Sequence, residues 1–268
     1  CFFMCTAISY KTKDHYFGRN LDLEYSYVES VTVTPRNFPF HFRKERDFPK
    51  HYAMIGMAYV QDEYPLYYDA TNEKGLSMAG LSFPGNAVYL CEKNDKYNVT
   101  PFELIPWVLG QCKDVREAKE LLEHTNLVKI AFSKELSLSP LHFMVSDTNA
   151  SLVLEPVEEG LRITENPVKV LTNNPPFAYQ MHHLNNYMAL TKKEPMNTFA
   201  KELPMEIYSR GMGGLGLPGD LSSASRFVRA AFTKWNSVDG GNEAESVNQF
   251  FHILGSVEQQ KGCVQLEK

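Results

Sequence analysis

The chain has 268 residues, enough to bury a sizeable core in one large domain or two small ones. Its formal net charge of -5 provides no basic surface, which argues against nucleic acid as a partner. No apolar run approaches the roughly 20 residues that a membrane-spanning helix needs, so we expect no membrane insertion.

The five cysteines are scattered along the chain, at positions 1, 5, 91, 112 and 263. An odd number without a C-x-x-C pair does not resemble a disulfide framework or a zinc site. We therefore expect a reducing, cytoplasmic environment and no metal or cofactor. The three later cysteines are interpreted as small buried or half-buried hydrophobes.

The first half of the chain is predicted to form strands and then helices. Alternating apolar residues bounded by turn formers predict strands over 5–10, 16–23, 28–35 and 51–60, with two more inside 66–83. Thr100 to Glu103 has the pattern of a capping box with proline at the first helical position, which predicts a helix over 101–112. Asp114 and Glu117 begin a second predicted helix, over 115–125.

The second half repeats this order of strands and then helices. Strands are predicted over 141–147, 151–157, 161–165 and 168–174, and helices over 179–190, 223–235 and 244–254. Blocks of strands followed by blocks of helices indicate an α+β fold with antiparallel sheets. No repeat or linker divides the chain, so we predict a single domain over 1–268.

The first two predicted strands bring three chemical groups together. With a turn near Lys13, position 5 pairs with positions 20–21, which places Cys5 close to Arg19 and Asp22. A guanidinium favours the thiolate, which is the reactive form of cysteine. A carboxylate nearby can orient an amine or hold the arginine. The residues alone favour a plainer reading, in which Arg19 and Asp22 form an exposed salt bridge of little consequence.

A cysteine nucleophile normally works with a general base, and the local sequence places no histidine beside Cys5. An α-amine on the same residue, with a pKa of roughly 8, could take that role. This requires Cys5 to be the first residue of the working protein. We therefore expect residues 1–4, Cys-Phe-Phe-Met, to be a leader or tag that is removed.

Longer stretches resemble the choloylglycine hydrolase family of N-terminal nucleophile (Ntn) amidases, which includes bile salt hydrolases and penicillin V acylases. The similarity covers Met4 to about Gln260 and includes MCTAISYKTKDHYFGRNLD, YDATNEKGLSMAGLSF, PFELIPWVLGQC, VLTNNP, SRGMGGLGLPGDLSSASRF and FFHIL. The resemblance implies an Ntn-hydrolase four-layer αββα sandwich with two antiparallel sheets. It also implies a homotetramer.

The resemblance implies a role for each matching residue. Cys5 would attack an amide carbonyl, with its own amine as base and later acid. Arg19 and Asp22 would steady the thiolate and the amine. Asn173 would donate a side-chain N–H to the tetrahedral oxyanion, and Arg226 would complete the polar network around the nucleophile.

Some of these residues also have plainer readings, and the chain departs from the family in two places. Asn173 ahead of Pro175 could simply end a strand in a turn, and Arg226 in a first helical turn indicates only a local partner. Ser82 stands where bile salt hydrolases typically carry asparagine; its backbone N–H could still reach the oxyanion, but the substrate contacts of that side chain are left open. The chain ends at CVQLEK where relatives continue into further strands, so we expect C-terminal strands to be missing.

The resemblance also predicts a substrate pocket. Its walls would include Leu21, Phe132, Leu136 and Leu141, which suit a steroid face but could equally be ordinary core residues. The predicted reaction is hydrolysis of glycine- or taurine-conjugated bile salts through a thioester. Ser82 keeps a penicillin V acylase open as an alternative. A catalytically silent bile-salt-binding scaffold is the third possibility, because residues ahead of Cys5 would block its amine.

Overall fold

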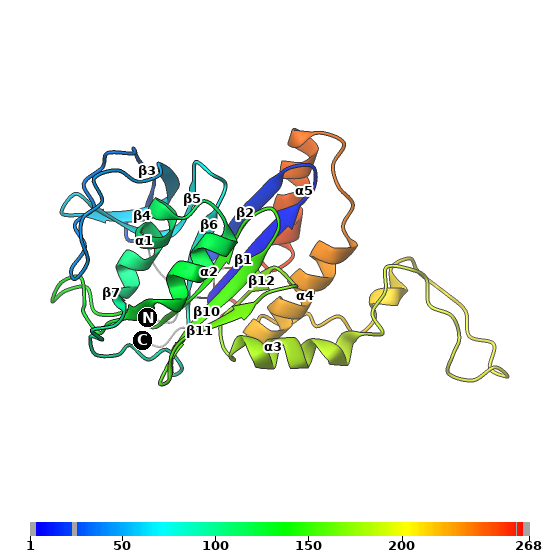
Figure 1. Cartoon of the computed structure of the whole chain (residues 1–268). Helices are drawn as coiled ribbons and strands as arrows, with labels where there is room; N and C mark the ends of the chain where they lie inside the picture. The colour runs from blue at the N-terminus through cyan, green and yellow to red at the C-terminus, as the bar shows by residue number, and fades with distance from the viewer. Residues whose placement is uncertain (1–3, 23–25, 261, 265–268) are drawn as a thin grey trace.

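Two antiparallel sheets lie face to face between two layers of helices in the computed structural model of the protein (Figure 1). The structure describes residues 4–22, 26–260 and 262–264. The larger sheet has the order β11-β10-β9-β6-β5-β4-β3 and the smaller one β12-β1-β2. Every neighbouring pair in these two sheets is antiparallel.

The strands have the following bounds: β1 Met4–Lys11, β2 His15–Asp22, β3 Ser30–Thr34, β4 Met54–Gln61, β5 Tyr64–Asn72, β6 Ser77–Ser82, β7 Tyr97–Val99, β8 Thr125–Leu127, β9 Leu141–Ser146, β10 Ser151–Val157, β11 Gly160–Glu165 and β12 Val170–Leu171. The helices are α1 Leu104–Gln111, α2 Val115–Glu123, α3 Phe177–Leu184, α4 Ser223–Asn236 and α5 Glu243–Gly255, with 3-10 turns η1 Pro101–Glu103, η2 Asn185–Tyr187 and η3 Met212–Gly214.

Side-chain alternation along the central strands of the larger sheet supplies two separate cores. Phe143 and Val145 of β9 pack into the core beneath α1 and α2. Met144, between them, points to the other face, where it packs with Phe227 of α4 and Ile253 of α5. Since successive side chains of a strand point to opposite faces, one buried strand serves both cores. The predicted four-layer αββα sandwich is confirmed.

The first hairpin has the predicted register. Cys5 pairs with Leu21, and Ala7 pairs with Arg19. Thr6 to Tyr10 of β1 are all buried, because β1 lies inside the smaller sheet with β12 on one side and β2 on the other. This places Cys5 at the end of a strand whose position is fixed from both sides.

Two predicted helices end earlier than the sequence pattern indicated. The segment predicted as a helix over 115–125 leaves the helix after Glu123 and enters the short parallel pair β7–β8. The helix predicted over 179–190 is α-helical only to Leu184 and then continues as the 3-10 turn η2. Strands of three residues are held by a distant partner, so no local pattern marks them.

Between η2 and α4 the chain leaves the body of the protein as a long extension, drawn in yellow in Figure 1. Its two ends are joined by a hydrogen bond from Thr191 N–H to Gly213 O, 3.0 Å long. A Cβ atom at Gly213 would lie 2.0 Å from Lys193 O, so the close approach requires glycine. We call residues 192–212 the arm. Its exposed apolar side chains are Met196, Phe199, Leu203, Met205, Ile207 and Tyr208.

Candidate active site

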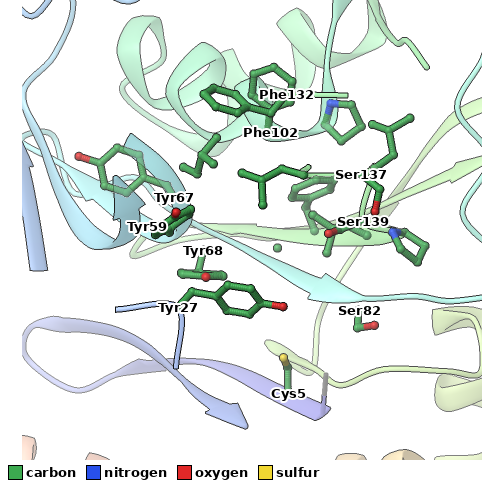
Figure 2. A pocket seen from close by; sticks show the side chains of 18 of the residues that line it. Cys5, Tyr27, Tyr59, Tyr67, Tyr68, Ser82, Phe102, Phe132, Ser137 and Ser139 are labelled. Carbon is green, nitrogen blue, oxygen red and sulfur yellow. The ribbon is translucent and has the colours of Figure 1, made fainter. Parts of the chain in front are cut away.

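Cys5 lies at one end of a cavity of about 460 Å³ that is lined by residues of both sheets, of η1 and of the loop before β9. Its side chain is only 1% exposed. Figure 2 shows its sulfur beside Ser82 at one end of the cavity, with Phe102 and Phe132 at the opposite end. A substrate with a long apolar body could therefore fill the cavity and present a bond at one end to the sulfur.

Arg19 connects the cysteine to the larger sheet. Its Nη2 donates to Cys5 Sγ over 2.5 Å, a contact that stabilises negative charge on the sulfur. Its Nη1 donates to Tyr68 O at 3.2 Å and Gly80 O at 2.5 Å. These carbonyls belong to β5 and β6 close to where their pairing ends, at Asp69 and Ala79. One guanidinium therefore contacts the sulfur and both strands.

Beyond Ala79, β6 is no longer paired with β5 but remains paired with β9 as far as Ser82. Phe83 N–H donates to Pro140 O, on the β9 side. In an antiparallel ladder the next residue faces the other way, so the N–H and C=O of Ser82 point away from β9. Asn173 Nδ2 indeed donates to Ser82 O from that side, at 2.9 Å. The backbone N–H of Ser82 therefore faces the same region as the Asn173 amide.

Arg226 fixes the orientation of that amide. Its guanidinium is fully buried, and Nη1 donates to Cys5 O at 2.6 Å and to Thr6 Oγ1 at 2.7 Å. Its Nη2 donates to Asn173 Oδ1 at 2.8 Å, and Oδ1 also accepts from the backbone N of Cys5 at 2.8 Å. With Oδ1 held by two donors, the NH₂ group of Asn173 must face Ser82. Burial lowers the pKa of Arg226, with the nearby Asp22 opposing that shift.

Asp22 lies on the other face of the hairpin from the sulfur. It pairs with Met4, one residue before Cys5, and strand alternation separates its side chain from that of Cys5. Burial raises its pKa to about 6, although Arg226 and Arg19 act in the opposite direction. Its buried Oδ2 has no hydrogen-bond partner among the described residues. Asp22 is therefore placed beside the backbone of Cys5 rather than beside its thiol.

The four pocket residues named from the sequence, Leu21, Phe132, Leu136 and Leu141, all line the cavity. Sequence reasoning missed the aromatic wall formed by Tyr27, Tyr59, Tyr67 and Tyr68. These tyrosines come from β4, β5 and the segment before β3. Tyr59, Tyr67 and Tyr68 lie inside predicted strands and Tyr27 lies just before one, and nothing local marks which side chains meet a ligand.

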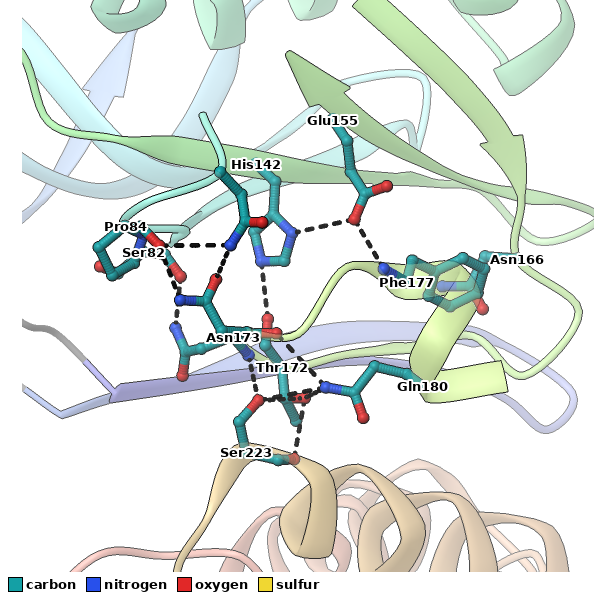
Figure 3. Close-up of polar contacts among 12 residues, drawn as sticks. Ser82, Pro84, His142, Glu155, Asn166, Thr172, Asn173, Phe177, Gln180 and Ser223 are labelled. Carbon is teal, nitrogen blue, oxygen red and sulfur yellow. Dashed lines mark hydrogen bonds and ion pairs between the residues drawn. The ribbon is translucent and has the colours of Figure 1, made fainter. Parts of the chain in front are cut away.

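Sequence reasoning also missed a buried polar network behind the site. His142 on β9 and Glu155 on β10 are 0% and 2% exposed, and they lie next to Thr172 and Phe177 (Figure 3). A charged residue inside a buried apolar strand is the signal that could have identified them, because such groups are buried only with partners.

No described part of the chain gathers three His, Cys, Asp or Glu side chains as metal ligands would. None of its described helices combines the length and apolarity that a bilayer crossing requires. Cys5, Cys91, Cys112 and Cys263 are free thiols. Cys112 is buried as expected, but Cys91 and Cys263 are exposed, so the expectation that they are buried or half-buried hydrophobes was wrong. Cys1 lies outside the described residues.

Residues 5–268 match the family model of linear amide C–N hydrolases, choloylglycine hydrolase family. The chain belongs to this family. It is 59% identical over 263 residues to a bile salt hydrolase/transferase from Lactiplantibacillus plantarum, an alignment covering 98% of this chain and 81% of the relative. A bile salt hydrolase/transferase from Clostridium perfringens is 37% identical over 264 residues, covering 97% and 80%.

Solved structures of choloylglycine hydrolases have the same fold. A mutant conjugated bile acid hydrolase from Clostridium perfringens superposes with a TM-score of 0.88 at 36% identity, covering 98% of this chain and 82% of the other. A penicillin V acylase from Agrobacterium tumefaciens has a TM-score of 0.77 at 20% identity, covering 97% and 74%, and shares the fold. The α+β Ntn-hydrolase class is therefore confirmed, and the protein is a linear amide C–N hydrolase by family.

Proposed function

We propose that the protein hydrolyses the amide bond of glycine- or taurine-conjugated bile salts, with Cys5 as the nucleophile. One observation carries the proposal: the Cys5 sulfur lies at one end of a largely apolar cavity, in contact with Arg19. The cavity volume is within the range of roughly 300–1,000 Å³ that small-molecule sites usually have. The high identity to a relative named bile salt hydrolase/transferase supports the substrate class.

The proposed reaction has two stages. The Cys5 thiolate attacks the amide carbonyl carbon, and the resulting oxyanion accepts hydrogen bonds from the Asn173 side chain and the Ser82 backbone N–H. The C–N bond then breaks, glycine or taurine leaves with a proton, and the bile acid remains as a thioester on Cys5. Water cleaves the thioester and releases the acid.

The proposed base is the α-amine of Cys5, which becomes available when the Met4–Cys5 bond is cut. Asn173 Oδ1 already accepts from the Cys5 nitrogen at 2.8 Å, so an acceptor for the amine is in place. The Asp22 carboxylate would stabilise the positive charge on the amine once it has taken up a proton, and Arg226 would hold the carbonyl of Cys5 and the Asn173 side chain in place. Intact mass and N-terminal sequencing test this step: an active protein beginning at Cys5 is expected, and an active protein beginning at Cys1 would contradict it.

Turnover of glycocholate, taurocholate and penicillin V tests the substrate class. We expect cleavage of the conjugated bile salts, and loss of at least about 10³-fold in kcat for Cys5→Ala with unchanged circular dichroism. Ser82 motivates the runner-up: if only penicillin V is cleaved, the protein is an acylase of the same family. Bile salt that binds without any product would instead identify a silent scaffold.

The names of the relatives from Lactiplantibacillus plantarum and Clostridium perfringens also include a transferase activity. The same thioester could react with an amine in place of water, and the product would then be a new amide. Incubation of glycocholate with an excess of a second amino acid, followed by mass spectrometry, tests this. New conjugates are expected, at a yield that rises with the amine concentration.

We further propose a homotetramer, which the family resemblance implies, and a cytoplasmic location, which was predicted from the scattered cysteines. The exposed apolar side chains of the arm support assembly, since contiguous apolar surface usually marks an interface. The free thiols fit a reducing compartment. We also propose that residues 1–268 form a single domain and that residues 1–4 are a leader or tag that is removed.

A further inference from the structure

A buried His–Glu pair lies directly behind the proposed oxyanion site, on two adjacent strands of the larger sheet (Figure 3). We propose that His142 is a positioning residue that aligns the two oxyanion donors, the Asn173 side chain and the Ser82 backbone N–H. The substrate in this inference rests on the proposed function, whereas the alignment of the two donors rests on contacts of the described residues.

His142 contacts both segments that carry the donors. Its Nε2 lies 2.8 Å from Thr172 O, and because a carbonyl only accepts, the ring must hold its proton on Nε2. Thr172 directly precedes Asn173. The ring also stacks on Phe83, with centroids 4.3 Å apart and planes inclined by 5°. Phe83 directly follows Ser82, so one imidazole fixes the position of a neighbour of each donor.

Glu155 holds the far end of the segment that contains Asn173. Its Oε1 accepts from Phe177 N–H at 2.7 Å, and the same oxygen lies 3.9 Å from His142 Nδ1. The chain from Thr172 to Phe177 is therefore attached to β9 at its beginning and to β10 at its end. Displacement of Asn173 would require movement of at least one of these two buried side chains.

Stability alone gives a poor account of this pair. Burying an ionisable pair costs desolvation, and apolar residues of similar volume are often as good or better for stability. His142 and Glu155 occupy positions in β9 and β10 where the neighbouring side chains are apolar. Their particular contribution is a directional hydrogen bond at each end of one loop, which an apolar pair cannot provide.

The variant His142→Leu tests the proposal, because it keeps an apolar side chain but removes the donor to Thr172 O. Misplacement of a catalytic group by 1 Å can cost about 10²-fold, so we expect kcat to fall by about 10- to 100-fold. KM should change by less than about 3-fold, since His142 does not line the cavity.

Two further variants separate the hydrogen bond from simple packing. Gln at position 142 places an amide N–H near the location of Nε2, so His142→Gln should retain kcat within about 5-fold. Asn is too short to reach Thr172 O, so His142→Asn should lose as much as His142→Leu. Met144→Leu, also fully buried on β9, is the matched control and should leave kcat unchanged.

The inhibition constant of an aldehyde distinguishes loss of the oxyanion donors from a general loosening of the fold. The aldehyde derived from cholic acid adds to the Cys5 thiolate, and the resulting hemithioacetal oxygen needs the same two donors. Its inhibition constant should rise in proportion to the loss of kcat/KM across the variants. Alkylation of Cys5 by iodoacetamide forms no oxyanion, so its rate should stay within about 2-fold of wild type.

The outcomes distinguish this inference from the proposed function. Wild-type turnover of glycocholate decides the function alone. If wild type cleaves only penicillin V, phenoxyacetaldehyde replaces the bile aldehyde and the comparison of variants is unchanged. Equal kcat in His142→Leu and wild type overturns the positioning role, and so does a parallel loss of aldehyde affinity and alkylation rate. If His142→Leu does not fold, the Gln and Asn pair decides by the same criteria.

Discussion

The orientation of one side-chain amide depends on Arg226. Three of its hydrogen bonds reach Cys5 O, Thr6 Oγ1 and Asn173 Oδ1, and the last of these turns the Asn173 NH₂ toward Ser82. A planar guanidinium can reach all three acceptors at once, whereas an ammonium at the end of a lysine cannot. The geometry of the proposed oxyanion site is therefore set by an arginine that lies 53 residues beyond Asn173 and 221 residues beyond Cys5 along the chain.

Arg226→Lys keeps the charge but loses the fork of donors. We expect kcat to fall by at least about 10²-fold and the free energy of unfolding to fall by about 2–4 kcal/mol, since buried acceptors lose their partners. Bile salt turnover and urea unfolding measure these two effects. Arg229→Lys, one turn away on α4, is the control and should change kcat little. A kcat within 3-fold of wild type in Arg226→Lys would contradict the assignment.

Asp22 gives a pH-dependent prediction for the chain in which Met4 still precedes Cys5. Burial raises the pKa of Asp22 from 3.8 to about 6, so the folded protein holds this proton more tightly than the unfolded chain. Burial of Asp22 therefore costs little below pH 4, and it destabilises the fold increasingly as pH rises through about 6.

Asp22→Asn stays neutral and should gain stability relative to wild type between pH 4 and pH 7. After discounting for solvent screening we expect about 1 kcal/mol, or roughly 2–4 °C in Tm. Thermal unfolding at several pH values measures it. A difference in Tm that does not change with pH would show that Asp22 is not the titrating group.

At the scale of elements, the loop over residues 132–141, which lines one side of the cavity, is held at both ends. Tyr89 Oη donates to Ser139 O at 2.7 Å and accepts from Leu141 N–H at 2.9 Å. At the other end, Arg43 Nη2 donates to Phe132 O at 3.0 Å, and its guanidinium lies over the Phe132 ring. This loop is therefore fixed at both ends, and its shape depends on two side chains outside it, those of Tyr89 and Arg43.

Tyr89→Phe removes one oxygen and both of its hydrogen bonds to this loop. The loop would contact the apolar body of the substrate equally in the ground state and the transition state. KM should therefore rise about 3- to 10-fold, with kcat nearly unchanged. Steady-state kinetics with glycocholate measure both constants. Tyr179→Phe, on the exposed surface of α3, should change neither. A fall in kcat without a change in KM would contradict a role confined to this loop.

Local contacts were predictable from the sequence, and distant ones were not. The register of β1 with β2 follows from one short turn, so the placement of Arg19 beside Cys5 was correctly predicted. The capping box predicted at Thr100 is likewise present, with Glu103 Oε2 accepting from Thr100 N–H at 3.1 Å. The predicted convergence of Asp22 with the thiol was wrong, because Asp22 pairs with Met4 and its side chain lies on the opposite face of the hairpin.

Contacts between distant segments needed either the family resemblance or the structure. Asn173 and Arg226 were named only by resemblance, because no periodicity relates them to Cys5. His142 was missed altogether, since its partners Thr172 and Phe83 come from two other parts of the chain. Hydrogen bonds across such separations leave no pattern within a window of ten or fifteen residues.

At the scale of the whole molecule, packing within the body of the protein gives no reason for the exposed apolar side chains of the arm. Phe199 and Met196 are 82% and 84% exposed, and the arm leaves and rejoins the body at the Thr191–Gly213 contact. A segment that projects from the body, is closed at its base and exposes apolar side chains is suited to contact a second copy of the chain.

Replacement of Met196, Phe199 and Tyr208 by serine should lower the oligomeric state from a tetramer to a smaller species. Analytical ultracentrifugation at micromolar concentration measures the mass. Phe251→Ser removes a comparably exposed ring from α5 and should leave the assembly intact. If the triple variant keeps the wild-type mass, the arm is not the assembly contact.

The distance along the chain between Cys5 and Arg226 has a consequence for biosynthesis. Their contact spans 221 residues, and a ribosome adds about 5–20 residues per second. The cysteine is therefore exposed to the cell for roughly 10–45 s before its arginine has even been translated. During that interval the nascent chain carries an ordinary thiol with no organised site around it. If Arg226 has the proposed role, amidase chemistry can begin only after residue 226 has been translated, and products that terminate before it should be inert.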